Sequence, residues 1–226
     1  IMPVFNEKNT ILDILEKVES ANAKGLEKEI IIIDDYSTDG TREILKKLEN
    51  KHKVIFHDKN YGKGEALKNG FNQAIGDVII IQDADLEYDP KDYNLLLDPI
   101  CEGKADVVYG CRFRGDKQRV LLFWHYIGNK FLTFLSNIFT NLNLTDMETG
   151  YKVFRKEVLD SFKTKLKSRR FGIEPEITAR IARGNWRIYE APINYYGRSY
   201  DEGKKIGWRD GVKAIFSIIY FNVFCR

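Results

Sequence analysis

The run Val78-Ile79-Ile80-Ile81-Gln82-Asp83-Ala84-Asp85-Leu86-Glu87 sets the architecture of this chain, because a short apolar segment leads directly into a group of carboxylates. Consecutive β-branched residues predict a strand that is buried on both faces, as in a parallel sheet. Ligands of open parallel sheets bind at the carboxyl ends of the strands. Asp83 and Asp85 are close enough that their like charges are costly unless a cation lies between them. The run therefore predicts a site for Mg²⁺ or Mn²⁺ at a strand end.

The same pattern of an apolar run, a turn and a segment of helical period recurs on both sides of this stretch. The other expected strands are residues 30–33, 54–56 and 107–109. The expected helices are residues 11–18, with a cap at Asn9 and a stop at Gly25, and residues 41–48, 65–74 and 92–101. Strands that alternate with helices at this spacing predict an α/β fold with a Rossmann-like, mostly parallel sheet flanked by helices.

After about Gly115 the regular alternation of expected strands and helices ends. The segment 120–141 is long, apolar and aromatic, residues 150–154 predict a strand, and residues 174–183 predict a helix. Residues 186–189 and 193–196 predict a short strand pair around Pro192. No linker rich in Pro, Gly or Ser separates the halves, so we expect the second half to elaborate the same domain.

The composition excludes several classes of protein. Of 226 residues, 43% are hydrophobic and 31% are charged, which is typical of a globular chain. No apolar run reaches the length of about 18 residues that a bilayer-spanning helix needs. The net charge of +3 is too balanced for nucleic acid to be the main partner. Three cysteines without C-x-x-C spacing fit a cytoplasmic protein better than a disulfide or zinc scaffold. The sequence starts at Ile1, already within an apolar run. We therefore expect that the natural chain extends beyond at least one end of this sequence.

Seven motifs occur in order along the chain. They are Pro3-x-Phe5-Asn6-Glu7, Asp34-Asp35-x-Ser37-x-Asp39-Gly40-Thr41, Asn60-x-Gly62-Lys63-Gly64-x-Ala66, Asp83-Ala84-Asp85-Leu86-Glu87, Gly110-x-Arg112-Phe113, Asp146-x-x-Thr149-Gly150-Tyr151 and Arg198…Gly203-Lys204. The first four together resemble the signatures of family 2 glycosyltransferases of GT-A fold. The last three are similar to the dolichyl-phosphate mannose synthase branch, whose members glycosylate polyprenyl phosphates. The resemblance implies one catalytic domain over residues 1–226, with a nucleotide-sugar-binding half (1–112) and an acceptor-binding half (113–226).

The resemblance also implies roles for individual residues. The residues expected to bind the nucleotide sugar, a GDP- or UDP-hexose, are Pro3, Phe5, Glu7, Asp34, Asp35, Lys63, Ala84, Arg198 and Lys204. Mg²⁺ or Mn²⁺ is expected on Asp83, Asp85 and Glu87, although Glu87 stands where the mannose synthases commonly have Gln. The acceptor phosphate is expected at Arg112, Arg119 and Lys130. Asp83, Asp85 and Arg112 are the expected catalytic residues.

The expected reaction is a metal-dependent, inverting transfer of a hexose to a dolichyl or undecaprenyl phosphate, in cell-envelope or glycoprotein glycan biosynthesis. An acceptor that is already an anion needs no general base. This sequence has no Glu-Asp dipeptide, the pair that many family members carry for that task. One alternative is transfer to a sugar hydroxyl of a glycan, with Asp146 or Glu148 as base. Another is a non-catalytic nucleotide-sugar-binding protein. The presence of Asp83, Asp85, Arg198 and Lys204 argues against it, because a degenerate site is expected to lose one of them.

Two segments suggest a peripheral position at the cytoplasmic face of the membrane. Residues 163–170 hold five basic side chains and no acid, and each basic residue near anionic lipid contributes about 1 kcal/mol. A solvated loop is the alternative for this segment. Residues 214–225 are apolar around most of the helical circumference, which predicts burial in the core or an interface.

Overall fold

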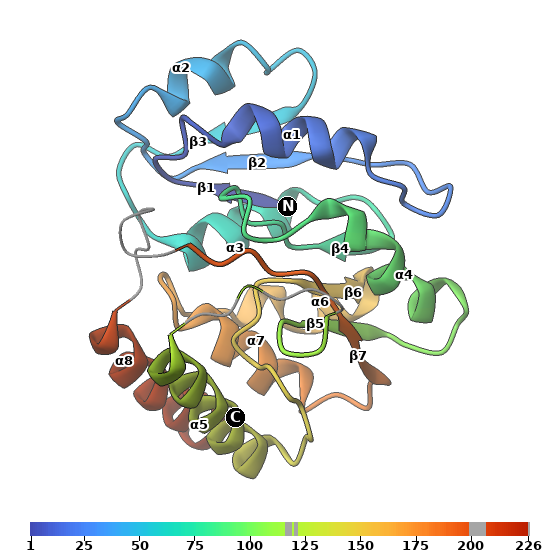
Figure 1. The fold of residues 1–226 in the computed structure, drawn as a ribbon, viewed down its shortest axis with the longest axis vertical. Helices are drawn as coiled ribbons and strands as arrows, with labels where there is room; N and C mark the ends of the chain where they lie inside the picture. The colour runs from blue at the N-terminus through green and yellow to red at the C-terminus, as the bar shows by residue number, and fades with distance from the viewer. Residues whose placement is uncertain (116–118, 120–121, 199–206, 226) are drawn as a thin grey trace.

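The computed structural model describes residues 1–115, 119, 122–198 and 207–225 (Figure 1). Its strands are β1 (Met2–Val4), β2 (Ile31–Asp34), β3 (Lys53–Phe56), β4 (Val78–Ile80), β5 (Val107–Cys111), β6 (Lys152–Arg155) and β7 (Ile188–Pro192). Its α-helices are α1 (Ile11–Ser20), α2 (Thr41–Lys46), α3 (Lys63–Gln73), α4 (Tyr93–Cys101), α5 (Phe123–Thr140), α6 (Lys156–Phe162), α7 (Ile173–Ile181) and α8 (Trp208–Ile219). Short 3₁₀ turns cover Pro90–Asp92 and Lys163–Lys165, and a π-helical segment, Tyr220–Phe224, follows α8.

The strands form two ladders, in the orders β1-β2-β3 and β4-β6-β5-β7. Ile1 joins the ladders, because its amino group donates to the carbonyl of Ile80 at 2.7 Å and its carbonyl accepts from the amide of Gln82 at 3.0 Å. The order across the sheet is therefore β3-β2-β1-β4-β6-β5-β7. Of the strands that the structure describes, β6 alone runs antiparallel to its neighbours, which agrees with a mostly parallel sheet.

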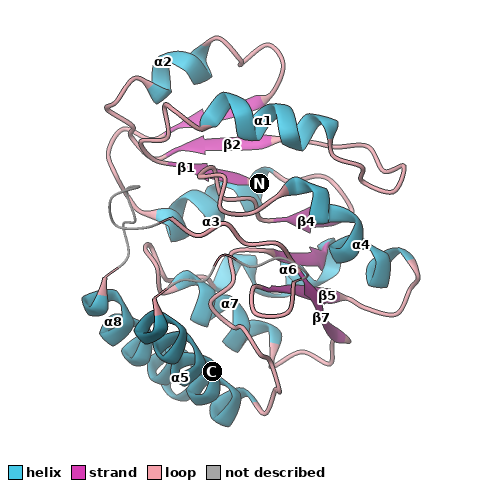
Figure 2. Cartoon of the chain, viewed as in Figure 1, coloured by secondary structure: helices cyan, strands magenta, loops and turns pink. Residues whose placement is uncertain are grey.

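Helices cover both faces of the sheet (Figure 2). On one face α1 buries Ile11, Ile14, Leu15 and Val18, the apolar positions of its sequence, in a core that also holds Leu96 and Leu97 of α4. On the other face Phe71 of α3 packs edge-on against the rings of Phe154 and Phe162, and these belong to a second core with α6 and α7. The two cores confirm strands that are buried on both faces.

Two expectations about the elements are wrong. Helix α1 begins after Thr10 rather than Asn9, and it ends at Ser20 because Ala21 is already extended, well before Gly25. The strand pair around Pro192 does not form. Instead β7 ends at Pro192 and pairs in parallel with β5, and the chain then crosses the sheet edge, where the amide of Asn194 donates to Asp92 Oδ2 at 2.6 Å.

Helices α5 and α8 lie side by side at the lower end of the molecule in Figure 1. Ala214 and Ile218 of α8 are buried, so the C-terminal apolar segment does contribute to the core. Many other large apolar side chains of α5, of α8 and of the segment after α8 are exposed, and we call them together the apolar face. Its members are Phe123, Trp124, Tyr126, Ile127, Phe131, Phe134, Ile138, Phe139, Val212, Phe216, Tyr220, Val223 and Phe224. Within the described ranges, we find no helix with the length and hydropathy needed to cross a membrane.

Candidate active site

Strained turns follow three neighbouring strands. Asn6 after β1, Tyr36 after β2 and Leu86 after β4 have φ angles of 54°, 66° and 62°, in the left-handed region that side chains other than glycine rarely adopt. Such residues cost about 1 kcal/mol or more each and cluster at functional sites. The turns bring the polar residues beside them to the carboxyl edge of the sheet.

A cavity of about 460 Å³ lies at this edge. Its wall combines the loops after β1, β2, β3, β4, β5 and β7 with the loop before β6 and the starts of α3 and α7. The lining residues are Pro3, Val4, Phe5, Glu7, Asp35, Asn60, Gly62, Lys63, Ala66, Asp83, Ala84, Asp85, Glu87, Tyr88, Arg112, Glu148, Gly150, Arg170, Phe171, Glu174, Tyr195 and Arg198.

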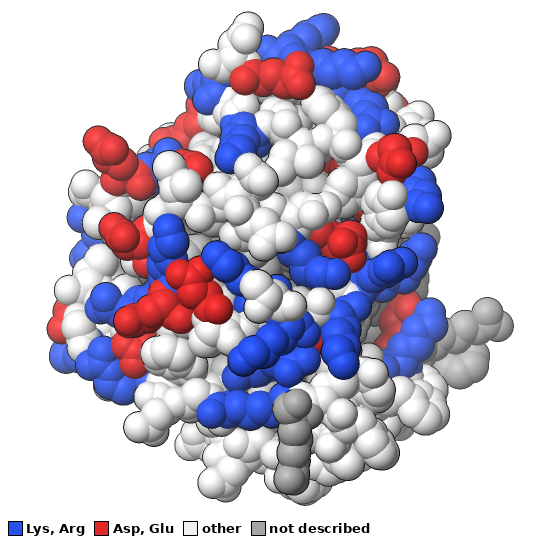
Figure 3. Space-filling view, turned by 180° about the vertical axis from the view of Figure 1, so that it is seen from behind, with Lys and Arg blue, Asp and Glu red and all other residues white. Residues whose placement is uncertain are grey.

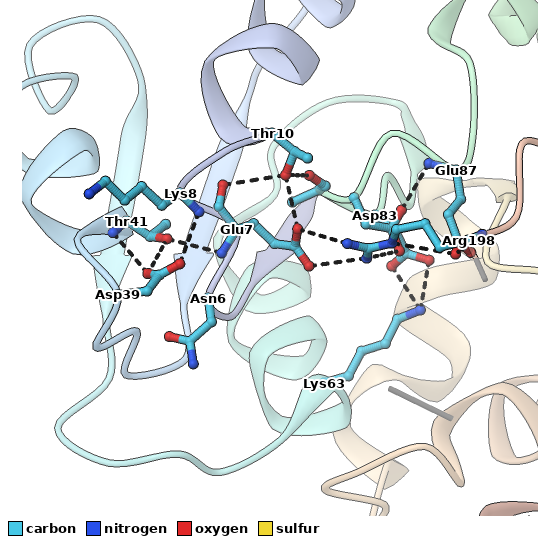
Figure 4. Close-up of polar contacts among 12 residues, drawn as sticks. Asn6, Glu7, Lys8, Thr10, Asp39, Thr41, Lys63, Asp83, Glu87 and Arg198 are labelled. Carbon is cyan, nitrogen blue, oxygen red and sulfur yellow. Dashed lines mark hydrogen bonds and ion pairs between the residues drawn. The ribbon is translucent and has the colours of Figure 1, made fainter. Parts of the chain in front are cut away.

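The carboxylates after β4 are paired with cations from distant parts of the chain (Figure 4). Lys63, in the first turn of α3, lies 2.8 Å from Asp83 Oδ1. Arg198 lies 3.1 Å from Asp85 Oδ2 and 3.3 Å from Glu7 Oε1, and its backbone amide donates to Glu87 at 2.9 Å. Figure 4 shows Arg198 between Glu7 on one side and Asp83 and Glu87 on the other. The negative charges of these carboxylates are therefore compensated by the positive charges of Lys63 and Arg198.

The acidic residues after β4 fit a hard divalent cation. Burial, and then the charges of Asp83 and Glu87, raises the pKa of Asp85 to about 7, so a further positive charge is favourable there. Among the described residues no group of three or more potential ligands converges as a ready metal cage. Mg²⁺ and Mn²⁺ need only one or two protein carboxylates when phosphate oxygens and waters complete the shell. Asp83 and Asp85 suit that arrangement, whereas Glu87 is turned toward Arg198 and toward the hydroxyl of Tyr195, which donates to it at 2.7 Å.

Arg112 enters the cavity from the end of β5 and is fixed by several contacts. Its guanidinium donates to both oxygens of Asp146, each at 2.7 Å, and Asp146 is fully buried. The guanidinium also lies over the ring of Tyr195, 5.2 Å from its centroid. Glu190 of β7 holds the loop that carries Asp146, because it accepts from the amides of Thr145 and Asp146 at 2.6 and 3.2 Å. Arg112 is therefore a rigidly placed positive group.

Asp35 shapes the part of the cavity next to β2. Its carboxylate accepts from the amides of Tyr61 and Gly62 at 2.8 and 2.7 Å, and His57 Nδ1 lies 2.8 Å away. Gly62 has a φ angle of +97°, and a Cβ atom there would lie 2.5 Å from the carbonyl oxygen of Arg169. Only glycine fits this turn, which delivers Lys63 to the cavity.

The structure brings most of the predicted site residues together. Those that line the cavity are Pro3, Phe5, Glu7, Asp35, Lys63, Asp83, Ala84, Asp85, Glu87, Arg112 and Arg198. Asp34 lies outside the cavity, fully buried, where Arg42 is 3.2 Å from its Oδ2 atom. Lys204 falls outside the described residues.

The other two predicted acceptor residues, Arg119 and Lys130, are not in the cavity wall. Arg119 donates to the carbonyl of Gly197 at 3.0 Å. Lys130 donates to the carbonyl of Thr145 at 3.0 Å and lies over the ring of Phe113. Lys130 thus contacts the loop that carries Asp146, the partner of Arg112, but it does not line the cavity.

Sequence reasoning did not select Glu174, Tyr195 or Phe171, and it quoted Asn60 only as part of a motif, without a role. All four line the cavity. Glu174 lies in the first turn of α7, 2.9 Å from Lys63 Nζ, and its sequence signal is only an acid at a helix start. Tyr195 reaches the cavity because the chain after β7 forms an isolated antiparallel bridge with Tyr88. Neither contact has a local sequence signature.

A mostly parallel sheet with carboxylates and arginines facing one cavity at its strand ends defines an α/β protein of the nucleotide-binding type. The chain belongs to glycosyl transferase family 2, whose family model matches residues 1–162. This finding confirms the family that the sequence motifs predict.

Curated relatives lie in the predicted branch. The dolichol-phosphate mannosyltransferase of Pyrococcus furiosus is 30% identical over 225 residues, which cover 97% of this chain and 60% of that protein. The UDP-N-acetylglucosamine–dolichyl-phosphate N-acetylglucosaminyltransferase of Methanococcus voltae is 26% identical over 99% of this chain and 95% of its own length. The chain therefore spans less than two thirds of the first relative and nearly all of the second.

A solved structure confirms the predicted GT-A fold. It is the glucosyl-3-phosphoglycerate synthase of Mycobacterium tuberculosis in complex with Mn²⁺, UDP and phosphoglyceric acid. It superposes with a TM-score of 0.72 over 98% of this chain and 77% of that chain, at 19% identity. At this identity the likeness establishes the fold.

Proposed function

We propose that this chain is a metal-dependent, inverting glycosyltransferase that moves a hexose from a GDP- or UDP-sugar to a polyprenyl phosphate. The observation that carries the proposal is the position of Asp83 and Asp85 in one cavity with Arg112. A carboxylate pair suited to a metal diphosphate thus faces a fixed guanidinium suited to a second phosphate. The names of the relatives from Pyrococcus furiosus and Methanococcus voltae, both dolichyl-phosphate enzymes, support this acceptor class.

The residues divide the chemistry between the two ends of the cavity. Mg²⁺ or Mn²⁺ held by Asp83 and Asp85 would supply Lewis-acid stabilisation of the charge on the departing nucleoside diphosphate. Lys63 and Arg198 add fixed positive charge at the same end. Arg112 orients the acceptor phosphate so that its oxygen attacks the anomeric carbon opposite the leaving group. Displacement from the opposite face inverts the anomeric configuration.

In this proposal, donor binding and acceptor binding are assigned to the two halves of the domain. Residues 1–112 supply the donor side through Phe5, Asp35, Lys63 and the acidic loop after β4. Residues 113–226 supply the acceptor side through α5, α8 and the loop before β6. Two arginines are exceptions. Arg198 comes from the second half, but the chain after β7 carries it back to the donor side. Arg112 is the last residue of the first half, but it is assigned to the acceptor phosphate.

The apolar face gives a lipid acceptor a surface to approach. Figure 3 shows, from behind, that Lys and Arg side chains gather across the middle of the molecule, above a lower part with few charges. That lower part is at the height of α5 and α8 in Figure 1. Apolar side chains flanked by basic ones suit a bilayer surface with anionic lipids. We therefore propose that the protein acts peripherally at the cytoplasmic face of a membrane.

Transfer to a sugar hydroxyl is a second candidate function, favoured by one observation. Burial, and then the charge of Glu174, raises the pKa of Glu148 to about 7, and Glu148 lines the cavity. A carboxyl group with that pKa is suited to act as a general base near neutral pH.

A donor and acceptor panel tests the proposal. GDP- and UDP-hexoses are incubated with Mg²⁺ or Mn²⁺ and either a short polyprenyl phosphate or a soluble glycan. Transfer to the lipid phosphate is expected, with loss of activity in Asp85→Asn and in excess chelator. Asp77→Asn, which removes an exposed carboxylate before β4, is the matched control and is expected to stay active. Transfer to the soluble glycan alone would instead support transfer to a sugar hydroxyl. If no donor and acceptor react, the chain would be a non-catalytic nucleotide-sugar-binding protein.

A further inference from the structure

His57 is a buried histidine that lies directly behind the cavity wall. It follows β3, its side chain is only 5% exposed, and its backbone amide continues the β2–β3 ladder by donating to the carbonyl of Asp34 at 2.9 Å. Both ring nitrogens have partners from other elements. Nδ1 lies 2.8 Å from Oδ1 of Asp35, and Nε2 lies 2.8 Å from Nδ2 of Asn69 on α3. The imidazole therefore connects a helix to a carboxylate that lines the cavity.

The hydrogen bonds decide which ring nitrogen carries the proton. Oδ1 of Asp35 already accepts from the amide of Tyr61, and Oδ2 accepts from the amide of Gly62, so this carboxylate acts as an acceptor. The contact with Oδ1 therefore requires a proton on Nδ1 of His57. Nε2 is then left as an acceptor, which matches the amide nitrogen of Asn69 that faces it. The hydrogen bonds thus run in one direction, from Asn69 through His57 to Asp35.

The surroundings leave the ring of His57 little freedom to move. Asn69 has a fixed position because Ala66, one turn earlier on α3, is buried in a small core with residues of β2. Arg42 of α2 donates to the carbonyl of His57. The ring of Tyr61 packs edge-on against the imidazole, with 5.2 Å between the ring centroids. His57 is therefore a rigid support for the carboxylate in front of it.

Asp35 keeps an acceptor position for a ligand. An ionised carboxylate offers about four acceptor positions. Among the described residues, Tyr61, Gly62 and His57 fill three of them, two on Oδ1 and one on Oδ2. The position that is left belongs to Oδ2, and Asp35 lines the cavity. Because His57 holds Oδ1, the carboxylate cannot rotate, and Oδ2 keeps this position for a donor in the cavity.

The sheet order indicates which part of a ligand meets Asp35. Asp35 follows β2, whereas Arg112 follows β5, and these strands lie on opposite sides of β4. In the proposed function the diphosphate lies at Asp83 and Asp85 after β4, and the acceptor lies at Arg112. The nucleoside then extends away from Arg112, past β1, to Asp35. A nucleobase and a ribose both offer N–H or O–H donors, which suit a carboxylate oxygen.

We propose that His57, held by Asn69, is a positioning residue that orients the carboxylate of Asp35 toward an N–H or O–H donor of the nucleoside. His57 acts through Asp35 and does not touch the nucleotide itself. This inference rests on the proposed function, because it needs a nucleotide in the cavity.

Calorimetric titration with UDP and with GDP, each in Mn²⁺, tests the role of His57. The wild type is expected to bind at least one of the two nucleotides. His57→Leu removes the donor to Asp35 and is expected to bind that nucleotide about tenfold more weakly, as loss of a hydrogen bond to a charged group does. His57→Asn is expected to recover most of the affinity, because the amide nitrogen of asparagine can take the position of Nδ1.

His52 offers a matched control for the loss of a buried histidine that contacts a carboxylate. Its Nε2 atom lies 2.7 Å from Oε1 of Glu19 and its side chain is only 7% exposed, but neither residue lines the cavity. His52→Leu is expected to bind the nucleotide like the wild type, even if its folded state is less stable. An affinity loss as large as that of His57→Leu would assign both losses to weakened folding and would overturn the positioning role.

A spectroscopic measurement on the wild type does not depend on whether a variant folds. A long-range ¹H–¹⁵N correlation spectrum of the ¹⁵N-labelled protein in mildly alkaline buffer shows which ring nitrogen of His57 is protonated. The proton is expected on Nδ1 and not on Nε2, and addition of the nucleotide is expected to shift the Nδ1 signal, because the carboxylate gains another donor. Absence of this signal from His57→Asn assigns it.

The outcomes separate the two proposals. If the wild type binds neither UDP nor GDP, the proposed function fails. If it binds one of them and His57→Leu binds it equally well, the positioning role is overturned and the proposed function stands. The same conclusion follows if His57→Asn binds no better than His57→Leu, or if Nε2 of His57 carries a proton in the wild type.

Discussion

The ammonium group of Lys63 lies 2.8 Å from Asp83 Oδ1, with each side chain only 17% exposed. The same group also contacts Glu174, so it compensates two carboxylates. Lys63→Met is expected to lower the free energy of unfolding by about 3 kcal/mol, because two nearly buried carboxylates lose their counter-charge. Mn²⁺ is expected to restore part of the loss by replacing the positive charge.

Urea denaturation with and without Mn²⁺ checks this expectation. Lys68→Met on the same helix, whose partner Glu65 lies outside the cavity, is the control. It is expected to lose less than about 1 kcal/mol, as partly exposed ion pairs do, and to gain nothing specific from Mn²⁺. An unchanged stability of Lys63→Met, or a loss that Mn²⁺ leaves untouched, would contradict the interpretation.

Arg112 and Asp146 are expected to be strongly coupled in a double-mutant cycle. Arg112→Met and Asp146→Leu each leave an unpaired charge in a buried place, and each is expected to lose about 3 kcal/mol or more. The double variant is expected to lose clearly less than the sum, because it leaves no unpaired charge. The more exposed pair Arg187–Asp106, with Arg187 54% exposed, is the control and should couple by less than about 1 kcal/mol. Additive losses at Arg112 and Asp146 would refute the coupling.

The sequence predicts the acidic part of the site well because that part is local. Asp83 and Asp85 come just after an apolar run, so the rule for parallel strand ends locates them, whereas Arg112 is selected through the family resemblance. The same rule also selects Asp34. Asp34 is the last residue of β2 and is fully buried beside Arg42, whereas Asp35, just after the strand, lines the cavity.

The positions of other lining residues depend on contacts between distant parts of the chain, including that of Arg198, which a motif selects but does not place. Glu148 is considered from the sequence only as an alternative base, and its place in the cavity follows from the insertion of β6 between β4 and β5. Tyr195 and Arg198 reach the cavity because β7 adds in parallel beside β5 and the chain then turns back to β4. A short apolar run carries no information about which strand it will join.

The raised pKa of Glu148 predicts a pH-dependent effect of Glu148→Gln on stability. The folded state holds the proton up to about pH 7, whereas the unfolded chain loses it near the ordinary value of 4.5. Ionisation of Glu148 therefore destabilises the fold progressively as the pH rises between these values, and the penalty is complete above pH 7. The Gln variant is expected to gain about 2 kcal/mol relative to the wild type between pH 5 and pH 8. Thermal or urea unfolding across this range measures the gain, and a difference that does not grow with pH would contradict it.

Trp124 is 78% exposed on the apolar face, and its fluorescence reports whether that face meets a bilayer. Vesicles with anionic lipid are expected to shift its emission to the blue, and Trp124→Phe is expected to remove the shift. Replacing Phe131 and Phe134 by serine is expected to weaken vesicle binding by at least about tenfold, because each phenyl ring loses more than about 1.4 kcal/mol of burial. Ile75→Ser, at an equally exposed residue away from α5 and α8, is the control and should bind normally. Equal binding by all variants would show that the apolar face does not contact lipid.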